Sequence, residues 1–366
     1  MIQMQRLLLT VTNDLNYDQR MIRICTSLSH AGYRVTLIGR RQRKSPPIVQ
    51  KNFFQKRLAC FFEKGKAFYV EYNLRLFFFL LFKKTDLICA IDLDTILPCY
   101  FVSKIKNTKR VYDAHELFCE MKEIVDRPGI YKIWKKIERF AVPKFKYGYT
   151  VNQLIADEFN KMYGRNYEVI RNLPLLMESA VPAKAEKYIL YQGAVNEGRS
   201  FETLIPAFLK VNSPLFIAGD GNFMEQAKEL VKKNKLEDKV IFLGKLDPAK
   251  LAGYTTGAWI GLTLFENKGL SNYYSLANRF FDYIQSGVPQ LCVEYPAYIN
   301  LNKKYNIAVL IKDLSPDSIA DKLNKLLKDD QLYNELQANC LKARMELNWQ
   351  HEEKKLVNFY QNIFNS

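Results

Sequence analysis

The chain has 366 residues, 48% of them hydrophobic and 25% charged, which is a globular composition on a chain long enough for two domains. Lys and Arg (54) outnumber Asp and Glu (38), so the net charge is +16 and we expect an anionic partner: a nucleotide-linked substrate, an anionic membrane surface or a nucleic acid. The seven cysteines are scattered without a C-x-x-C pair, and only three histidines occur. This pattern indicates reduced thiols and excludes a zinc site.

Membrane-spanning and secretory segments are not expected. The longest apolar run, residues 76–82, is far shorter than the roughly 20 residues that a spanning helix needs. The first residues also lack the long apolar stretch and the small-residue cleavage site of a signal peptide. We therefore expect a cytoplasmic protein.

Strand-like and helical segments alternate along both halves of the chain, which predicts parallel sheets covered by helices. In the first half we expect a helix at 19–31 and strands at 7–11, 35–38, 86–91 and 110–112. In the second half we expect strands at 188–192, 215–218, 240–243, 259–264, 290–293 and 308–311, each followed by a helix.

Residues 172–187, with Pro174 and Pro182, have the turn-rich character of a linker. After Pro316 the chain is expected to be helical, and apolar residues at helical spacing predict a last helix over 349–364. We thus predict an N-terminal domain over 1–175, a C-terminal domain over 176–345, and a C-terminal segment, 346–366, that packs back toward the first domain.

A glycine-containing loop links the apolar strand at 188–192 to an amphipathic helix: Gly193-x4-Gly198-Arg199-Ser200. Glycines let backbone amides approach an anion, the start of a helix offers unpaired N–H groups, and Arg199 adds a fork of donors. The spacing nearly matches a P-loop, with Arg in place of Lys. The loop therefore predicts a phosphate site, although an ordinary glycine turn has the same pattern.

Several further motifs stand in order along the chain. They are Asn13-Asp14, Asp18-Gln19-Arg20, Tyr112-Asp113-Ala114-His115-Glu116-Leu117, Ala218-Gly219-Asp220-Gly221, Phe242-Leu243-Gly244-Lys245 and the run from Ser275 to Pro289. In order and spacing the chain resembles the family-four retaining glycosyltransferases of the GT-B fold. The resemblance implies two doubly wound, Rossmann-like domains facing an interdomain cleft.

The resemblance also implies transfer of a sugar from a nucleotide-diphosphate donor to an acceptor, with retention at the anomeric carbon and with neither a cofactor nor a bound metal. Without a metal, Arg, Lys and helix N-termini must compensate the charge of the diphosphate. The donor-binding residues implied are Gly193, Gly198, Arg199, Gly219, Gly244, Lys245, Asn278, Arg279 and Asp282. An arginine at the start of a helix can equally be a solvent-exposed surface residue, and this alternative stays open for Arg279.

One glutamate of the family pattern is missing. Asp282 stands where the second glutamate of an E-x7-E motif contacts the ribose, but Tyr274 occupies the position of the first. Glu266, on the loop after the strand at 259–264, is the nearest alternative carboxylate for the donor sugar, although it can also be a surface residue.

His115 follows the strand at 110–112 and so lies at a carboxyl strand edge, which in open α/β sheets borders the binding crevice. The resemblance implies that this histidine contacts the donor sugar, and we assign the catalytic roles to His115 and Glu266. Asp113 and Glu116 flank His115 as acceptor-side residues that could orient it. Asp18 and Arg20, where the family carries glycines, complete the acceptor side.

Residues 40–84 interleave basic and aromatic side chains, a composition that suits the surface of an anionic membrane and a lipid-linked or glycan acceptor. A helix packed through its phenylalanines, with lysines facing water, has the same composition. No nucleic-acid-binding module is recognised, so we expect no nucleic-acid partner.

The leading hypothesis is a glycosyltransferase in cell-surface polysaccharide or glycolipid synthesis, cytoplasmic and peripheral on the membrane. Three alternatives remain: a nucleotide-sugar epimerase, a catalytically silent nucleotide-sugar binder, to which Tyr274 points, and a P-loop ATPase. The ATPase would need a metal-binding Asp after an apolar strand, and Ala90-Ile91-Asp92 offers one in the other half of the chain.

Overall fold

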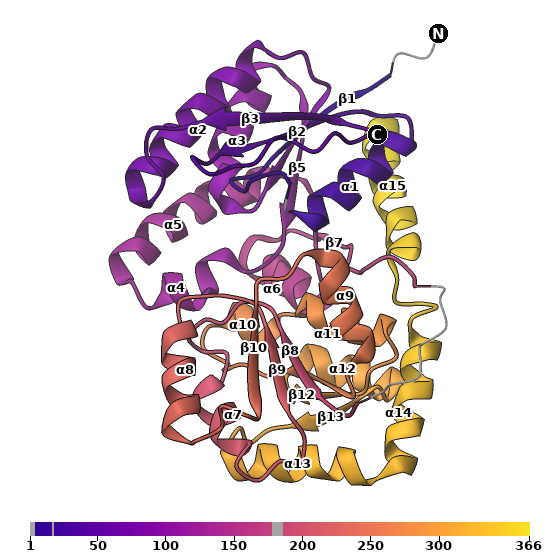
Figure 1. The fold of residues 1–366 in the computed structure, drawn as a ribbon. Helices are drawn as coiled ribbons and strands as arrows, with labels where there is room; N and C mark the ends of the chain where they lie inside the picture. Colours follow the sequence, from indigo (N-terminus) through magenta and orange to yellow (C-terminus); the bar gives the residue numbers. More distant parts are fainter. Residues whose placement is uncertain (1–3, 17, 178–185) are drawn as a thin grey trace. The chain divides into compact units, whose positions relative to one another are not determined.

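The computed structural model describes residues 4–16, 18–177 and 186–366, which form two compact units (Figure 1). The first unit comprises the chain up to Asn172 together with Gly269–Ser271 and Glu352–Ser366, and the second comprises Leu173–Lys268 and Asn272–His351. The middle of the expected linker, residues 178–185, lies outside the described residues.

The first unit is built on a seven-stranded parallel sheet with the strand order β3-β2-β1-β4-β5-β6-β7. Its strands are β1 (Arg6–Thr10), β2 (Arg34–Arg41), β3 (Phe54–Ala59), β4 (Leu87–Ile91), β5 (Lys109–Ala114), β6 (Tyr147–Thr150) and β7 (Glu168–Val169). The central strands β1 and β4 are almost wholly buried and apolar, as expected for a parallel sheet covered on both faces.

Helices cover both faces of this sheet: α1 (Gln19–His30), α2 (Gly65–Phe82), α3 (Ile96–Ile105), α4 (Lys122–Val125), α5 (Pro128–Ala141), α6 (Gln153–Tyr163) and, from Glu352 onward, α15 (Trp349–Asn365). Short 3-10 helices lie at Leu93–Thr95, Phe118–Glu120 and Val142–Lys144. Helices α2, α3 and α5 pack side by side on one face, and α1 and α15 lie on the other (Figure 1). On that second face α15 packs its rings on the sheet, with Phe359 edge-on to Tyr149.

The second unit is built on a six-stranded parallel sheet with the order β10-β9-β8-β11-β12-β13. Its strands are β8 (Ile189–Gln192), β9 (Leu215–Ala218), β10 (Val240–Gly244), β11 (Ile260–Thr263), β12 (Gln290–Val293) and β13 (Ala308–Ile311). Its helices are α7 (Phe201–Ala207), α8 (Met224–Lys233), α9 (Pro248–Gly257), α10 (Leu270–Tyr274), α11 (Asn278–Gln285), α12 (Pro296–Tyr305), α13 (Pro316–Lys328) and α14 (Asp330–Ala343), with the first residues of α10 belonging to the first unit.

The two doubly wound α/β sheets confirm the predicted fold class, and all the strands expected from the sequence are present, with ends that differ by at most three residues. No disulfide joins the seven cysteines, all of which lie within the described ranges. Three strands were not predicted: β3, β6 and β7.

The basic and aromatic stretch 40–84 comprises the end of β2, the edge strand β3 and helix α2. Helix α2 buries Phe68, Tyr72, Leu76 and Leu80, a single i, i+4 row, and leaves the rest of its apolar side chains partly or largely exposed. Of the helices in the described ranges, none has the length and apolar character that crossing a membrane would require.

Candidate functional site

The predicted site residues gather at the carboxyl edges of the two sheets. In each sheet the strand order reverses once, between β1 and β4 in the first unit and between β8 and β11 in the second. Loops that leave such a point diverge to opposite faces, which opens a crevice where ligands of open α/β sheets bind. His115 directly follows β5 beside the first of these points, and Gly193 directly follows β8 at the second.

His115 is held between two carboxylates. Its backbone N–H donates to Asp92 Oδ1 at 2.9 Å, and its Nδ1 lies 3.2 Å from Asp92 Oδ2. On the other side of the ring, Nε2 lies 3.5 Å from Asp113 Oδ2, too far for a strong hydrogen bond. The side chain is 23% exposed, so the imidazole is fixed from two neighbouring strand ends and still reaches solvent.

Asp113 also binds Arg20, which projects from the first turns of α1. Arg20 Nη2 donates to Asp113 Oδ1 at 2.6 Å, and the two side chains are only 5% and 0% exposed. The Nε and Nη1 atoms of Arg20 are buried and have no hydrogen-bond partner among the described residues. Arg20 therefore neutralises Asp113 inside the unit, and its predicted acceptor contact remains a prediction.

Asp92 has an unusual backbone for a residue with a side chain, with φ of +55° and ψ of 175°. Its own N–H donates to the carbonyl of Asp113, which continues the pairing of β4 with β5. Strained backbone of this kind persists when the surrounding structure fixes it, and it concentrates at functional sites. Here the strain turns the Asp92 carboxylate toward His115.

These charges set the protonation states of the cluster. Burial alone would lower the pKa of His115, but the carboxylates of Asp92 and Asp113 outweigh it and raise this pKa to about 10. Burial of Asp94, reinforced by the charge of Asp92, raises the pKa of Asp94 to about 7, although Thr12 donates to this carboxylate at 2.5 Å. At neutral pH the imidazole is thus a cation and hydrogen-bond donor.

Two further acceptor-side candidates are Asp18 and Glu116. Asp18 caps α1 by accepting the N–H of Met21 at 3.0 Å, and it also accepts Asn13 Nδ2 at 3.1 Å. Glu116 directly follows His115 and is partly buried. These contacts of Asp18 make it the N-cap of α1, and its predicted acceptor contact remains a prediction.

In the second unit, glycines bring the strand-end loops into backbone contact. The N–H of Gly219 donates to the carbonyl of Gly244 at 2.8 Å, and a Cβ on Gly219 would lie 1.8 Å from the carbonyl oxygen of Gly193. A Cβ on Gly193 would lie 2.9 Å from Nη1 of Arg279. The predicted glycines after β8, β9 and β10 are therefore neighbours, and any side chain at Gly219 would collide with backbone.

Arg279 is buried at this edge without an acidic partner. Its side chain extends from the first turn of α11, donates from Nη1 to the carbonyl of Gln192 at 3.0 Å, and stacks over the ring of Tyr191 with 4.6 Å to the centroid. The residue is 8% exposed, and its buried Nε and Nη2 have no hydrogen-bond partner in the described part of the chain. The alternative of a solvent-exposed helix arginine is therefore wrong.

The loop after β11 meets the loop after β8. The N–H of Glu266 donates to the carbonyl of Gly198 at 2.9 Å, and Arg199 lies over the ring of Phe265 at 5.6 Å. Glu266 pairs with Lys268 at 3.3 Å. Ser200, between this loop and α7, has a left-handed backbone and a buried hydroxyl with no hydrogen-bond partner among the described residues.

Asp282 lies one turn along α11 from Asn278, the exposed first residue of that helix. Its Oδ2 accepts Gln192 Nε2 at 3.0 Å, and Gln192 Oε1 in turn accepts the hydroxyl of Thr255 at 2.7 Å. Lys245 follows Gly244 and is exposed. The structure thus collects the predicted donor residues of the second unit at the ends of four adjacent strands, β10, β9, β8 and β11.

Sequence reasoning missed several members of these clusters. Asp92 had been noticed only as a candidate metal ligand of an ATPase, whereas it pairs with His115. Asp94 and Gln192 had no motif, and the hydroxyl of Ser200 had been treated only as the start of a helix. For Asp92, Asp94 and Gln192 the available signal was position, because each lies at or within three residues of the carboxyl end of a buried strand, whereas Ser200 lies eight residues beyond β8.

Residues 175–343 match the family model described as glycosyl transferases group 1. Over this part of the chain the match supports the predicted resemblance to glycosyltransferases and not the P-loop interpretation of the loop at 193–200. A curated relative, alpha-monoglucosyldiacylglycerol synthase of Streptococcus pneumoniae, is 24% identical over 198 residues, which is 52% of this chain. The chain spans about 40% of the length of that relative.

Solved structures match along nearly the whole chain. Sucrose-phosphate synthase from Thermosynechococcus elongatus has a TM-score of 0.80 at 15% identity and covers 99% of both chains. The Anabaena protein HepE, solved with UDP and glucose, has a TM-score of 0.74 at 13% identity and covers 99% of this chain and 100% of its own. At these identities the matches establish the fold, which is GT-B.

Proposed function

We propose that the protein is a retaining, metal-independent hexosyltransferase that moves a sugar from a nucleotide-diphosphate donor to a glycan or lipid-linked acceptor. The observation that carries the proposal is Arg279, a buried guanidinium at the carboxyl edge of β8 with two unsatisfied N–H-bearing atoms and no acidic partner among the described residues. A buried cation of this kind is costly unless an anion arrives. The diphosphate of a nucleotide-sugar supplies that anion.

The neighbours of Arg279 suit the same ligand. Gly193 and Gly219 bring the loops after β8 and β9 into backbone contact beside Arg279, and the unpartnered hydroxyl of Ser200 can donate to a phosphate oxygen. Asp282 is positioned by Gln192, so we assign it to the ribose hydroxyls, and Glu266 to the donor sugar. HepE was solved with UDP and glucose, which makes UDP-glucose the first donor to test.

In the proposed reaction, the bond between the anomeric carbon and the diphosphate oxygen breaks, and its electron pair leaves with the nucleoside diphosphate. The acceptor oxygen forms the new bond on the same face of the sugar. His115 is already protonated, so it cannot take the proton of the acceptor hydroxyl. We assign that proton to the departing diphosphate oxygen, and to His115 a hydrogen bond to a sugar or acceptor hydroxyl through Nε2.

The proposed setting is surface polysaccharide or glycolipid synthesis at the cytoplasmic face of the membrane. Its support is the basic and aromatic surface around β3 and α2 and the name of the streptococcal relative, a synthase of a glucosylated diacylglycerol. Such an acceptor is embedded in lipid, and basic residues hold a protein near anionic headgroups.

The test is turnover in excess EDTA, with UDP-glucose and other nucleotide-sugars as donors and a bacterial lipid extract as acceptor. We expect release of nucleoside diphosphate that depends on the acceptor, and a glycoside product with the anomeric configuration of the donor by NMR. Inversion, or activity only with added divalent metal, would contradict the mechanism.

A second candidate, a silent nucleotide-sugar binder, is favoured by Tyr274 at the usual glutamate position and by the pairing of Glu266 with Lys268. That candidate predicts donor binding without release of diphosphate under any acceptor condition. An epimerase would instead convert the nucleotide-sugar with no acceptor present.

A further inference from the structure

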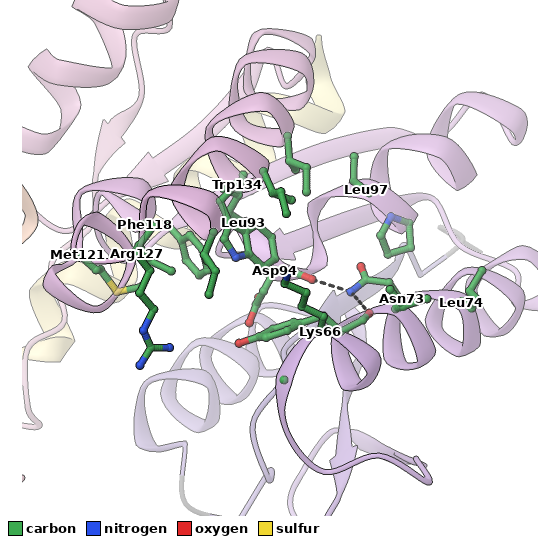
Figure 2. A pocket seen from close by; sticks show the side chains of 18 of the residues that line it. Lys66, Asn73, Leu74, Leu93, Asp94, Leu97, Phe118, Met121, Arg127 and Trp134 are labelled. Atoms are coloured by element: carbon green, nitrogen blue, oxygen red, sulfur yellow. Dashed lines mark hydrogen bonds between the residues drawn. The ribbon is translucent and has the colours of Figure 1, made fainter. Parts of the chain in front are cut away.

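A large apolar pocket lies within the first unit. It has a volume of about 930 Å³ and is formed by α2, α3, α4 and α5 with the short helices that precede α3 and α4. Figure 2 shows Leu74, Leu97 and Trp134 facing this pocket. Its size is at the upper end of what small-molecule sites in proteins have.

The pocket is unusually apolar for a surface accessible to water. Besides Leu97 and Trp134, its lining includes Val70 and Leu74 of α2, which are 61% and 56% exposed, and Ile133 of α5, which is 49% exposed. Contiguous exposed apolar surface is rare in soluble proteins and marks a binding site. The occupant must therefore be largely hydrocarbon.

One end of the pocket is polar. Helices that connect parallel strands run against the strand direction, so the N-terminal ends of α2, α3 and α5 all lie at the carboxyl edge of the sheet. At these ends the pocket is lined by Lys66, Asp94, Glu123 and Arg127, whereas the lining farther along the helices is apolar except for Asn73 of α2. Figure 2 shows Met121 and Arg127 on one side of the view and Leu74 on the other.

This polar end adjoins the His115 cluster. Asp94 is two residues beyond Asp92, whose carboxylate pairs with His115, and the charges of Asp92 and His115 both act on the Asp94 carboxyl group. From Ile130 to Ile137 the apolar side chains of α5 line about 10 Å of the pocket, at about 1.5 Å per residue. A chain lying along α5 would thus present its polar end beside the candidate site.

The charge around the pocket favours an acidic head. Lys66 and Arg127 line the pocket, and the other exposed bases on α2, α5 and their adjoining residues are Lys64, Arg75, which pairs with Glu71, Lys83, Lys84, Lys132, Lys136 and Arg139. Exposed acids on the same segments are Glu63, Glu123 and Asp126. The excess of bases complements a phosphate and opposes a cationic amphiphile.

We propose that this pocket binds the hydrocarbon chain of a single lipid-linked acceptor, with its anionic phosphate head at the polar end near Lys66 and Arg127. The inference rests on the proposed function, because it names the acceptor class of that transferase. In this proposal α2, α3 and α5 bind one lipid chain, whereas attraction of the basic surface to a bilayer would select no single lipid molecule.

The test uses monomeric 12-bromododecyl phosphate and the full-length protein. Bromine quenches tryptophan fluorescence at short range, and Trp134 lines the pocket, whereas Trp259 and Trp349 belong to the second unit. We expect saturable quenching that disappears in Trp134→Phe. Leu74→Asp, which puts a charge in the apolar lining, should weaken binding about tenfold or more.

Leu209→Asp is the matched control, because Leu209 is 57% exposed and lies in the second unit. Its affinity for the probe should equal that of the wild type. Arg127→Glu should weaken binding of the phosphate probe but not binding of dodecanol, which lacks the charge. The proposal that the lipid chain binds in this pocket would be overturned by quenching that persists in Trp134→Phe. It would also be overturned if Leu74→Asp and Leu209→Asp lost affinity for the probe equally.

Binding only to phosphatidylglycerol vesicles, without quenching by the monomer, would also overturn it in favour of adsorption on a bilayer. The failure of the proposed function is distinguishable, since nucleotide binding is measured separately in the same variants. If the protein bound the lipid probe but no nucleotide-sugar, the lipid-binding proposal would hold and the proposed transferase function would be rejected.

Discussion

The two units differ in whether the charged side chains at their candidate sites have partners of opposite charge. In the first, His115 lies between Asp92 and Asp113, and Arg20 neutralises Asp113, so the cations and anions are paired within the unit. In the second, Arg279 has a carbonyl and an aromatic ring as partners and no acidic side chain among the described residues. The first arrangement fixes a cationic imidazole in place, and the second leaves a charge to be balanced by a ligand.

Among the variants that test this contrast, we expect the largest loss of stability in Asp113→Ala. Asp113→Ala leaves Arg20 buried without its partner, so we expect the free energy of unfolding to fall by about 3–5 kcal/mol, measured by urea denaturation. The double variant Arg20→Met/Asp113→Leu removes both charges and should recover much of the loss. A double variant no more stable than Asp113→Ala would refute the pairing argument.

His115→Gln should cost about 2 kcal/mol at acidic pH, where both carboxylates stabilise the imidazolium. Because folding raises the pKa of His115 to about 10, this stabilisation is complete below about pH 6.5 and is lost as the pH rises through 10. Urea denaturation at pH 6, 8 and 10 should therefore show wild type and variant converging. A constant difference across the series would contradict the raised pKa.

Asp94→Asn tests the neighbouring carboxyl group, and we expect it to change the free energy of unfolding by about 1 kcal/mol. Because folding raises the pKa of Asp94 to about 7, the wild type should lose stability between about pH 4 and pH 7, as the folded state holds a proton that the unfolded chain releases. The variant should lack this loss. Equal slopes of stability against pH in the two proteins would argue against a protonated Asp94.

The smallest expected change in stability is at Arg279. Arg279→Met keeps the side-chain volume and removes a charge that lacks an acidic partner, so the free energy of unfolding should change by at most about 1 kcal/mol. Thermal or urea denaturation checks this directly. A loss as large as that in Asp113→Ala would mean that Arg279 is a structural residue and that the contrast between the units is wrong.

Much of the fold could be predicted because central parallel strands are short, apolar and regularly spaced. Strands β1, β4, β8 and β12 are buried on both faces and show it in their sequences. Edge strand β3, with the adjacent basic residues Lys56 and Arg57, instead resembles a surface segment, and β7 has only two residues. Such edges are defined by their pairing partners and not by their own composition.

The site divides in the same way. Residues adjacent to strand ends, such as His115 and Gly193, could be placed from the sequence, since chain position fixes their location. The partner of His115 could not, because Asp92 pairs with it across two strands and only through a strained backbone. The burial of Arg279 was also not predictable, because a helix start in the sequence does not show which loop covers it.

The most direct test of the central claim is calorimetric titration of UDP, GDP and ADP in excess EDTA into the wild type and Arg279→Met. Arg344→Met serves as the control, since Arg344 also donates to a carbonyl, that of Gln285 at the other end of α11. We predict that one diphosphate binds the wild type and the control equally and Arg279→Met about 100-fold more weakly. Equal affinity in all three proteins, or no diphosphate binding without a metal, would contradict the account.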